Sequence, residues 1–187
     1  MAHRAPAPDR RGIRVGLLSR TALSQVDQTA DFLEQLAPVQ VDDDATTVTT
    51  MGRPALHARI DVAGTPIDVV CCHLKSKLLT FPGGRFSTSD EDERARYAVY
   101  ALGRRAAEAA TVRGIATQLL DGDGQHRAVV VLGDLNDTKH SATTSLINGP
   151  GGSEIGRVGV EPDLVGACEA SGARPELLVE LEATAAA

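Results

Sequence analysis

The sequence predicts an α/β (α+β) fold, in which a mixed β-sheet carries helices on its surface. Residues 55–62 alternate apolar and polar side chains, and a turn at 63–66 leads into the apolar run 67–74; together they predict a hairpin. Residues 91–120 are rich in Ala, Glu and Arg, which favour a long helix. The apolar run 128–132 follows this helix, so a helix-connected strand is expected beside the hairpin in a mixed sheet.

Shorter segments complete the expected order of elements. Residues 13–19 form an apolar run typical of a short buried strand. Residues 24–38 have apolar positions at mixed spacing and are expected to be a loop with one short helical turn. The acidic run 42–44 and the threonines after it predict a solvated loop that enters a strand. Ser89 is the expected cap of the long helix, and residues 141–147 predict a short second helix.

The chain of 187 residues is long enough for one domain with a sizeable core. We expect a disordered lead at 1–12, a partial domain at 13–156, and a tail of atypical composition at 157–187. The three cysteines show no pairing pattern, which is typical of reduced thiols in the cytoplasm. No apolar run approaches the roughly 18 residues that span a bilayer, so no membrane association is expected. The sequence leaves the oligomeric state open.

The net charge of –6 argues against a protein that binds a polyanion by bulk electrostatics. It is compatible with phosphate chemistry, because a bound divalent cation can supply positive charge locally.

Two predicted strands deliver polar side chains to their carboxyl ends, where ligands of α/β proteins commonly bind. His73 follows the apolar run of the hairpin, and Asp134 and Asn136 follow the last strand. If that segment is extended, the side chains of Asp134 and Asn136 point the same way. Their oxygens and amide group can hold a divalent cation, orient a water or hydrogen-bond a phosphate. A structural histidine and a plain turn after the strand are the alternatives.

The motifs resemble those of the endonuclease/exonuclease/phosphatase superfamily, which has the deoxyribonuclease I-like fold. The Gly-Asp-Leu-Asn sequence at 133–136 resembles that family's Gly-Asp-hydrophobic-Asn motif. The His-Leu-Lys-Ser sequence at 73–76 resembles its strand-end histidine motif, and residues 14–20 resemble an earlier strand that ends in Ser-Arg. The motifs come in the family's order, and the similarity covers about residues 12–155.

The resemblance implies a four-layer sandwich, with two mixed β-sheets face to face and helices outside, and a hydrolase of phosphodiesters or phosphomonoesters that uses Mg²⁺ or Mn²⁺. It implies catalytic roles for His73, Asp134 and Asn136, of which Asp134 and Asn136 are also the expected metal ligands. Arg20, Lys75 and Ser76 are the expected substrate-binding residues. The implied substrate is a phosphorylated small molecule or a nucleic acid. A non-catalytic protein that binds a phosphorylated ligand or a partner on the same scaffold is the alternative.

The sequence also departs from the family pattern at both ends. The family's strands with an Asn and a metal-ligating Glu, which normally precede the Ser-Arg strand, are missing before Ile13. The terminal Asp-His pair is missing after Asn136, since His140 is the last histidine. We therefore expect a sandwich truncated at both ends, with low or no intrinsic activity.

Overall fold

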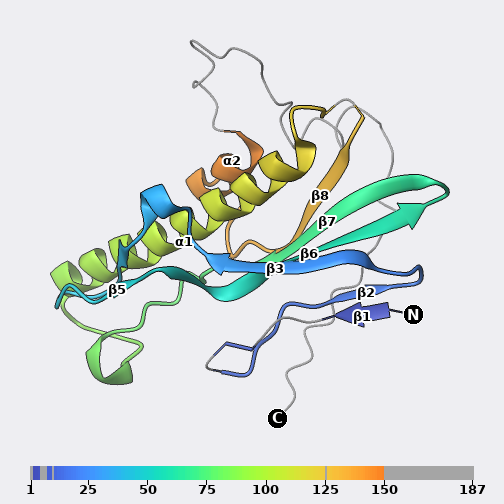
Figure 1. Ribbon diagram of the computed structural model, residues 1–187. Helices are drawn as coiled ribbons and strands as arrows, with labels where there is room; N and C mark the ends of the chain where they lie inside the picture. Colours follow the sequence, from blue (N-terminus) through green and yellow to red (C-terminus); the bar gives the residue numbers. More distant parts are fainter. Residues whose placement is uncertain (1, 5–7, 10, 125, 150–187) are drawn as a thin grey trace.

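The computed structural model describes residues 2–4, 8–9, 11–124 and 126–149, and these form a mixed α/β fold (Figure 1). A four-stranded sheet has the order β3-β6-β7-β8. Strands β3, β6 and β7 are antiparallel neighbours, and β8 lies parallel to β7. This arrangement confirms the predicted fold class. The main elements are β3 (Ser24–Asp31), β6 (Thr50–Val62), β7 (Thr65–His73), α1 (Glu91–Leu120), β8 (Ala128–Asp134) and α2 (Ala142–Asn148).

Two small sheets and two 3₁₀ turns accompany this framework. One sheet pairs the chain's first strand with a strand from the predicted run 13–19, and the other adjoins the acidic loop. These smaller elements are β1 (Ala2–Arg4), β2 (Leu17–Ser19), η1 (Glu34–Leu36), β4 (Val39–Gln40), β5 (Thr47–Val48) and η2 (Pro82–Gly84).

The β6–β7 hairpin closes through a two-residue turn. Ala63 and Gly64 both have positive φ, 54° and 87°, which matches the twist of a hairpin turn. The Gly64 N–H donates to Asp61 Oδ1 at 2.7 Å. The register Val62↔Thr65 then continues along both strands. Strand β7 therefore runs from this turn to His73, at the end of the sheet away from the turn.

Helix α1 begins and ends with local caps. Asp90, and not the expected Ser89, is the N-cap, and its carboxylate accepts the N–H groups of Asp92 and Glu93. A carboxylate at this end also interacts favourably with the helix dipole. Asp121 ends the helix in the left-handed conformation, with φ of 50°.

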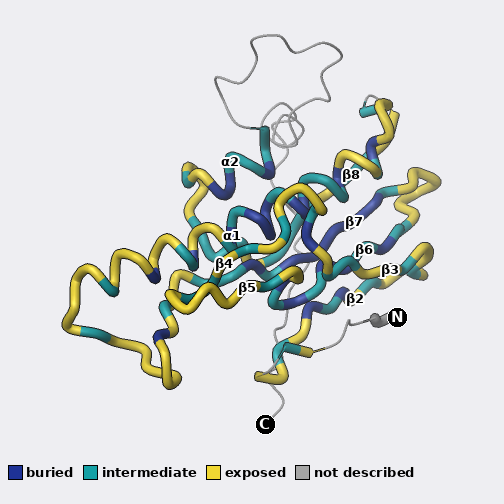
Figure 2. Tube along the Cα trace, turned by 60° about the vertical axis from the view of Figure 1, so that its left-hand side comes forward, coloured by how far each residue is buried: buried dark blue, intermediate teal, exposed yellow. Residues whose placement is uncertain are grey.

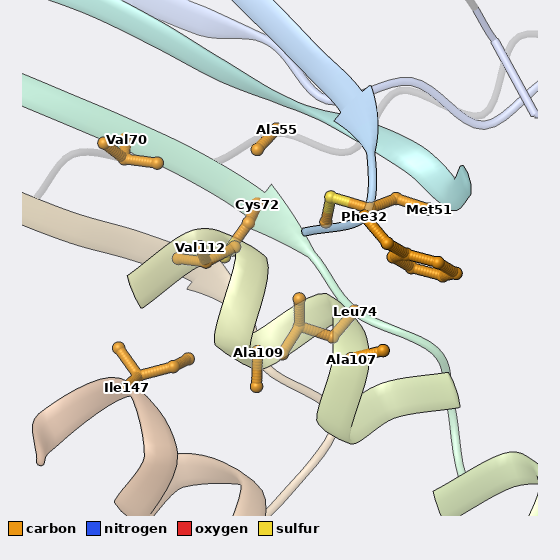
Figure 3. Close-up of a cluster of buried hydrophobic side chains, with 10 residues drawn as sticks. All are labelled: Phe32, Met51, Ala55, Val70, Cys72, Leu74, Ala107, Ala109, Val112 and Ile147. Atoms are coloured by element: carbon orange, nitrogen blue, oxygen red, sulfur yellow. The ribbon is translucent and has the colours of Figure 1, made fainter. Parts of the chain in front are cut away.

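Both faces of the sheet are covered, as the apolar composition of β7 predicts. Helices α1 and α2 cover one face over a buried cluster that includes Val70 and Cys72 (Figure 3). On the other face, Leu17 of β2 packs in a second cluster with Val69 and Cys71. In Figure 2 the buried stretches follow this sheet and the inner face of α1. The described residues thus provide a helix layer, a sheet and part of a second sheet. No helix in the described ranges lies outside β1–β2 to complete the fourth layer of the expected sandwich.

The structure differs from the sequence-based expectations in two segments. Residues 24–38 contain β3 in addition to the expected short turn η1. The sequence does not indicate this strand, because it is an edge strand with mostly polar side chains and is held by its backbone pairing to β6. The expected disordered lead contains β1, which pairs with β2.

Other expectations fall outside the described residues. The expected tail at 157–187, with Cys168, is among them. In the described part of the chain, no helix has the length and apolar character needed to cross a membrane.

Candidate functional site

The parallel pairing of β7 and β8 places His73 and Asp134 side by side. They are register partners at the carboxyl ends of the two strands. His73 Nε2 lies 3.6 Å from Asp134 Oδ2, and the two side chains are 24% and 60% exposed. A reactant can therefore reach the carboxylate from solvent, while the imidazole is more enclosed. The sequence predicted this meeting of two strand ends.

Asn136 joins this pair through a different geometry from the expected one. The strand ends at Asp134, and Asn136 has a left-handed φ of 50°, so the segment is not extended. The Asn136 backbone N–H donates to Asp134 Oδ1 at 2.8 Å. Its side-chain amide donates to the Leu74 carbonyl at 2.9 Å. The site therefore comes from a tight turn, and Asp134 itself forms part of that turn.

Gly133 allows β8 to approach β7 closely just before the site. Its φ is 128°, and a Cβ built on it would lie 1.9 Å from the Cys72 carbonyl oxygen. Real Cβ atoms do not come so near to a backbone oxygen, so the position requires glycine. The next residue then accepts the Leu74 N–H at its carbonyl, at 2.9 Å. This bond ties the two strand ends together.

Buried charged side chains hold the backbone beyond β7, and the sequence analysis did not identify them. Arg53, on β6, donates to the carbonyls of His73 and Leu74, each at 3.0 Å. Glu108, on α1, accepts the Lys75 N–H at 2.5 Å. Arg105, also on α1, donates to the Lys75 carbonyl at 3.3 Å. A signal was present, because both helix residues fall on the inward stripe of α1.

The surroundings keep the imidazole of His73 neutral near pH 7. Burial lowers its pKa, the positive charge of Arg53 lowers it further, and Asp134 opposes this shift only in part. A neutral imidazole can donate or accept a proton at one ring nitrogen.

Lys75 is the most perturbed cation near the site. Burial, followed by the charge of Arg104, lowers the pKa of Lys75 to about 8. Its ammonium group donates to the carbonyls of Ser76 and Leu78, at 2.9 and 2.6 Å. The Lys75 ammonium group therefore bonds to the backbone of the loop that follows it. Its charge lies near the site, but its hydrogen bonds are made within that loop.

Asp137 forms an ionic cluster next to the turn. Its carboxylate binds Lys77 Nζ at 2.7 Å and Arg105 Nε at 3.3 Å. Thr143, on α2, donates to it at 2.5 Å. The hydrogen bonds from Lys77 and Thr143 hold the pKa of Asp137 well below its usual range. This carboxylate is therefore fully engaged in joining the loop after β7 to α2.

The remaining expected substrate-binding residues are less well supported. Arg20 is exposed just after β2, and among the described residues it forms no hydrogen bond or ion pair. Ser76 follows Lys75 and is half-buried, and its carbonyl serves as an acceptor for that lysine. The structure therefore brings together His73, Asp134 and Asn136, with Lys75 adjacent, and does not connect Arg20 to them.

The described residues offer only part of the ligand set of a metal ion. Within the described ranges, no group of three or more His, Cys, Asp or Glu side chains is arranged to hold one. Asp134 and Asn136 offer oxygen ligands, but Asp134 already uses Oδ1 to accept the Asn136 N–H. Mg²⁺ requires close to six oxygen ligands, and these two residues supply only part of that set.

No family model and no curated protein sequence matches this chain. Among solved structures, the chain is similar to the crystal structure of sphingomyelinase C from Streptomyces griseocarneus, with 17% sequence identity and a TM-score of 0.40. The alignment covers 73% of this chain and 37% of that chain, so the chain spans little more than a third of that structure's length.

Proposed function

We infer that this chain has the site of a phosphoester hydrolase, acting on phosphodiesters or phosphomonoesters. The observation that supports this function is the convergence of His73, Asp134 and Asn136 at the ends of two adjacent parallel strands. A carboxylate and a carboxamide in one turn, beside a neutral imidazole at the end of β7, match the groups needed to activate a water and bind a phosphate.

Each of the three side chains has a role that follows from its surroundings. Asp134 is exposed and has one carboxylate oxygen outside the turn, so it orients or deprotonates the attacking water. His73 is neutral, so its one ring N–H donates a hydrogen bond to the phosphate or to the leaving oxygen. Asn136 uses one amide hydrogen on the Leu74 carbonyl and keeps the other for a phosphate oxygen.

A phosphate anion beside Asp134 needs compensating positive charge. Arg53 and Arg105 are fixed behind the site, and Lys75 and Lys77 lie in the loop after β7. The resemblance implies Mg²⁺ or Mn²⁺ as a further source of charge, and the described residues alone do not hold such an ion. The assay therefore has to include these metals as a variable.

The substrate that fits best is a phosphorylated small molecule. The chain is acidic overall, with a net charge of –6, and has no tryptophan, three phenylalanines and two tyrosines. A protein that tracks single strands of nucleic acid usually combines a basic groove with aromatic stacking residues. The composition therefore favours a compact phosphoester over a nucleic acid.

The test is hydrolysis of bis(p-nitrophenyl) phosphate, measured with Mg²⁺, with Mn²⁺ and with a chelator. Asp134→Asn preserves the shape of the side chain and should abolish product release. Asp123→Asn is the matched control, since Asp123 forms an exposed pair with His126 at 2.6 Å, outside the site. Equal loss in both variants, or unchanged activity in Asp134→Asn, would contradict the proposal.

A non-catalytic phosphate-binding protein is the second candidate. It is favoured by the incomplete set of metal ligands, because phosphoryl transfer depends on a metal and positioned groups together. Binding of inorganic phosphate or p-nitrophenyl phosphate by calorimetry, lost in Asn136→Ala and unaccompanied by turnover under any metal condition, would establish this candidate.

A further inference from the structure

The backbone of residues 73–75 is where β7 stops pairing and the site begins. Buried backbone polar groups need partners, and a segment that leaves a sheet loses its regular ones. One bond remains to β8, from the Leu74 N–H to the Asp134 carbonyl. The other partners are side chains from elements far away in the sequence.

Arg53 supplies the donors on one side of this segment. Its Nε and Nη2 reach the carbonyls of His73 and Leu74, and its Nη1 binds Asp9 Oδ2 at 3.0 Å. Arg53 is 6% exposed, so its guanidinium is buried with its hydrogen-bonding groups satisfied. Since Leu74 also accepts the amide of Asn136, Arg53 fixes the carbonyl on which that catalytic candidate rests.

Glu108 supplies the acceptor on the opposite side. Its two carboxylate oxygens accept the Lys75 N–H at 2.5 Å and the Gly52 N–H at 3.0 Å. The side chain is 1% exposed, and Arg104 Nε lies 3.4 Å away. One buried carboxylate therefore joins α1, β6 and the segment after β7. Burying a charge at such a place is costly unless its hydrogen bonds are needed there.

We propose that Arg53 and Glu108 are positioning residues of the site, a two-sided clamp on residues 73–75 that sets His73 and the Leu74 carbonyl under Asn136. The clamp acts by geometry and touches no reacting atom. The kinetic part of this inference rests on the proposed function, whereas its structural part can be tested without any activity.

The experiment compares Arg53→Met and Arg53→Lys with a matched control, Arg59→Met. Arg59 also lies on β6 and binds a buried carboxylate, Asp68, at 2.6 Å, but its interactions involve no residue of the site. For Glu108, the variant Glu108→Gln keeps the shape, but its carboxamide can accept only at one atom, so one of the two backbone N–H groups loses its partner.

Hydrogen exchange and the NMR shifts of the Asn136 side-chain amide provide the readout that is independent of activity. In Arg53→Met and Glu108→Gln we expect this amide to exchange faster and to shift toward free-asparagine values. Arg59→Met should leave it unchanged even though it also lowers the unfolding midpoint. Arg53→Lys should restore it in part, because it keeps a buried donor.

In bis(p-nitrophenyl) phosphate hydrolysis, Arg53→Met and Glu108→Gln should lower kcat by about 100-fold, the typical loss for a misplaced site, with KM much less affected. If Arg53→Met and Glu108→Gln fold and their Asn136 side-chain amide exchanges at the wild-type rate with wild-type NMR shifts, the clamp is overturned, whatever the activity. Should Arg53→Met not fold, the same measurement on Glu108→Gln decides. Absence of turnover in the wild type refutes the proposed function and leaves the amide measurement to test the clamp.

Discussion

Asn136 shows how a single backbone conformation assembles the site. A left-handed φ is unfavourable for most side chains, but asparagine tolerates it because its short polar group can bond locally. Here that conformation turns the chain back, so that Asp134 accepts the Asn136 N–H and the Asn136 amide reaches Leu74. The residue type is therefore needed twice, once for the backbone and once for the side-chain bond.

These two needs can be separated by a pair of substitutions. Asn136→Ala removes the amide and keeps a Cβ in the left-handed region, whereas Asn136→Gly removes the amide and relieves the backbone. We expect Asn136→Ala to be less stable than Asn136→Gly by about 1 to 2 kcal/mol, the cost of left-handed φ for an ordinary residue. Denaturant unfolding measures the difference. Both should lose activity equally, and equal stabilities would show that position 136 is not held at positive φ.

Lys75 predicts a pH dependence of stability. Its pKa is about 8 in the folded protein against 10.5 for a free side chain, so the folded state binds this proton less tightly than the unfolded state does. The resulting destabilisation is complete below about pH 8 and is lost as the pH rises toward about 10.5. Relative to Lys75→Met, the wild type should therefore gain stability between about pH 7 and about pH 10.

The measurement is the free energy of unfolding of both proteins at several pH values in this range. Other groups titrate there too, which is why the difference between the two proteins is the informative quantity. Parallel curves would mean that the lysine is as well solvated in the folded protein as in the unfolded chain. A wild type that loses stability relative to Lys75→Met would mean that its ammonium form is favoured by folding.

At the level of single residues, the sequence predicted that three candidate side chains lie together, but not the side chains that hold their backbone. His73, Asp134 and Asn136 were found because each follows an apolar strand, a signal that local sequence contains. Arg53 and Glu108 contact backbone groups supplied by distant segments. The helical spacing places Glu108 on the buried side of α1, but it does not indicate which backbone groups the carboxylate binds. The left-handed turn at Asn136 was also missed, because a two-residue spacing was interpreted as extended backbone.

At the level of elements, a helix or strand could be predicted where its own residues favour that structure. The hairpin β6–β7 has an alternating pattern and a turn, and helix α1 is rich in residues that favour helix. The predicted helix at 91–120 matches Glu91–Leu120. Strand β3 has polar side chains at most positions and exists because β6 offers it a backbone edge. Tertiary pairing of this kind overrides local propensity, and only a structure reveals it.

Two glycine-to-alanine substitutions, one in strand β8 and one in helix α1, should have opposite effects on stability. In Gly133→Ala the new Cβ would meet the Cys72 carbonyl, so β7 and β8 must separate where Asp134 is positioned. We expect a loss of about 2 to 4 kcal/mol from backbone strain and overpacking together, with loss of activity. Gly103→Ala, in α1, meets nothing within 4 Å and should stabilise the protein by about 0.5 to 1 kcal/mol.

Thermal or denaturant unfolding of the two variants measures both the expected loss of stability and the expected gain. Because the chemical change is the same methyl group, the comparison isolates the backbone environment. If Gly133→Ala unfolds like the wild type, the close approach of β8 to β7 is not rigid, and the placement of Asp134 beside His73 would not depend on it.

At the level of the whole molecule, the site lies at one end of a sheet whose two faces have different covers. Helices α1 and α2 pack on one face and β2 on the other, so β7 is apolar on both sides (Figure 1). Strand β8 ends the strand order, and Val130 on it is 42% exposed. The polar groups of the site lie at the carboxyl ends of β7 and of the edge strand β8.

The few metal ligands among the described residues predict that Mg²⁺ alone has little effect on stability. An ion that binds only the folded state at 100 times its Kd raises stability by about 2.7 kcal/mol. Asp134 and Asn136 supply too few oxygens for tight binding, so millimolar Mg²⁺ without substrate should change the unfolding midpoint of the wild type and of Asp134→Asn by the same small amount. Differential scanning fluorimetry with Mg²⁺, and with Na⁺ at matched ionic strength, measures this. A Mg²⁺ shift confined to the wild type would contradict this prediction and show that Asp134 is a ligand of the ion.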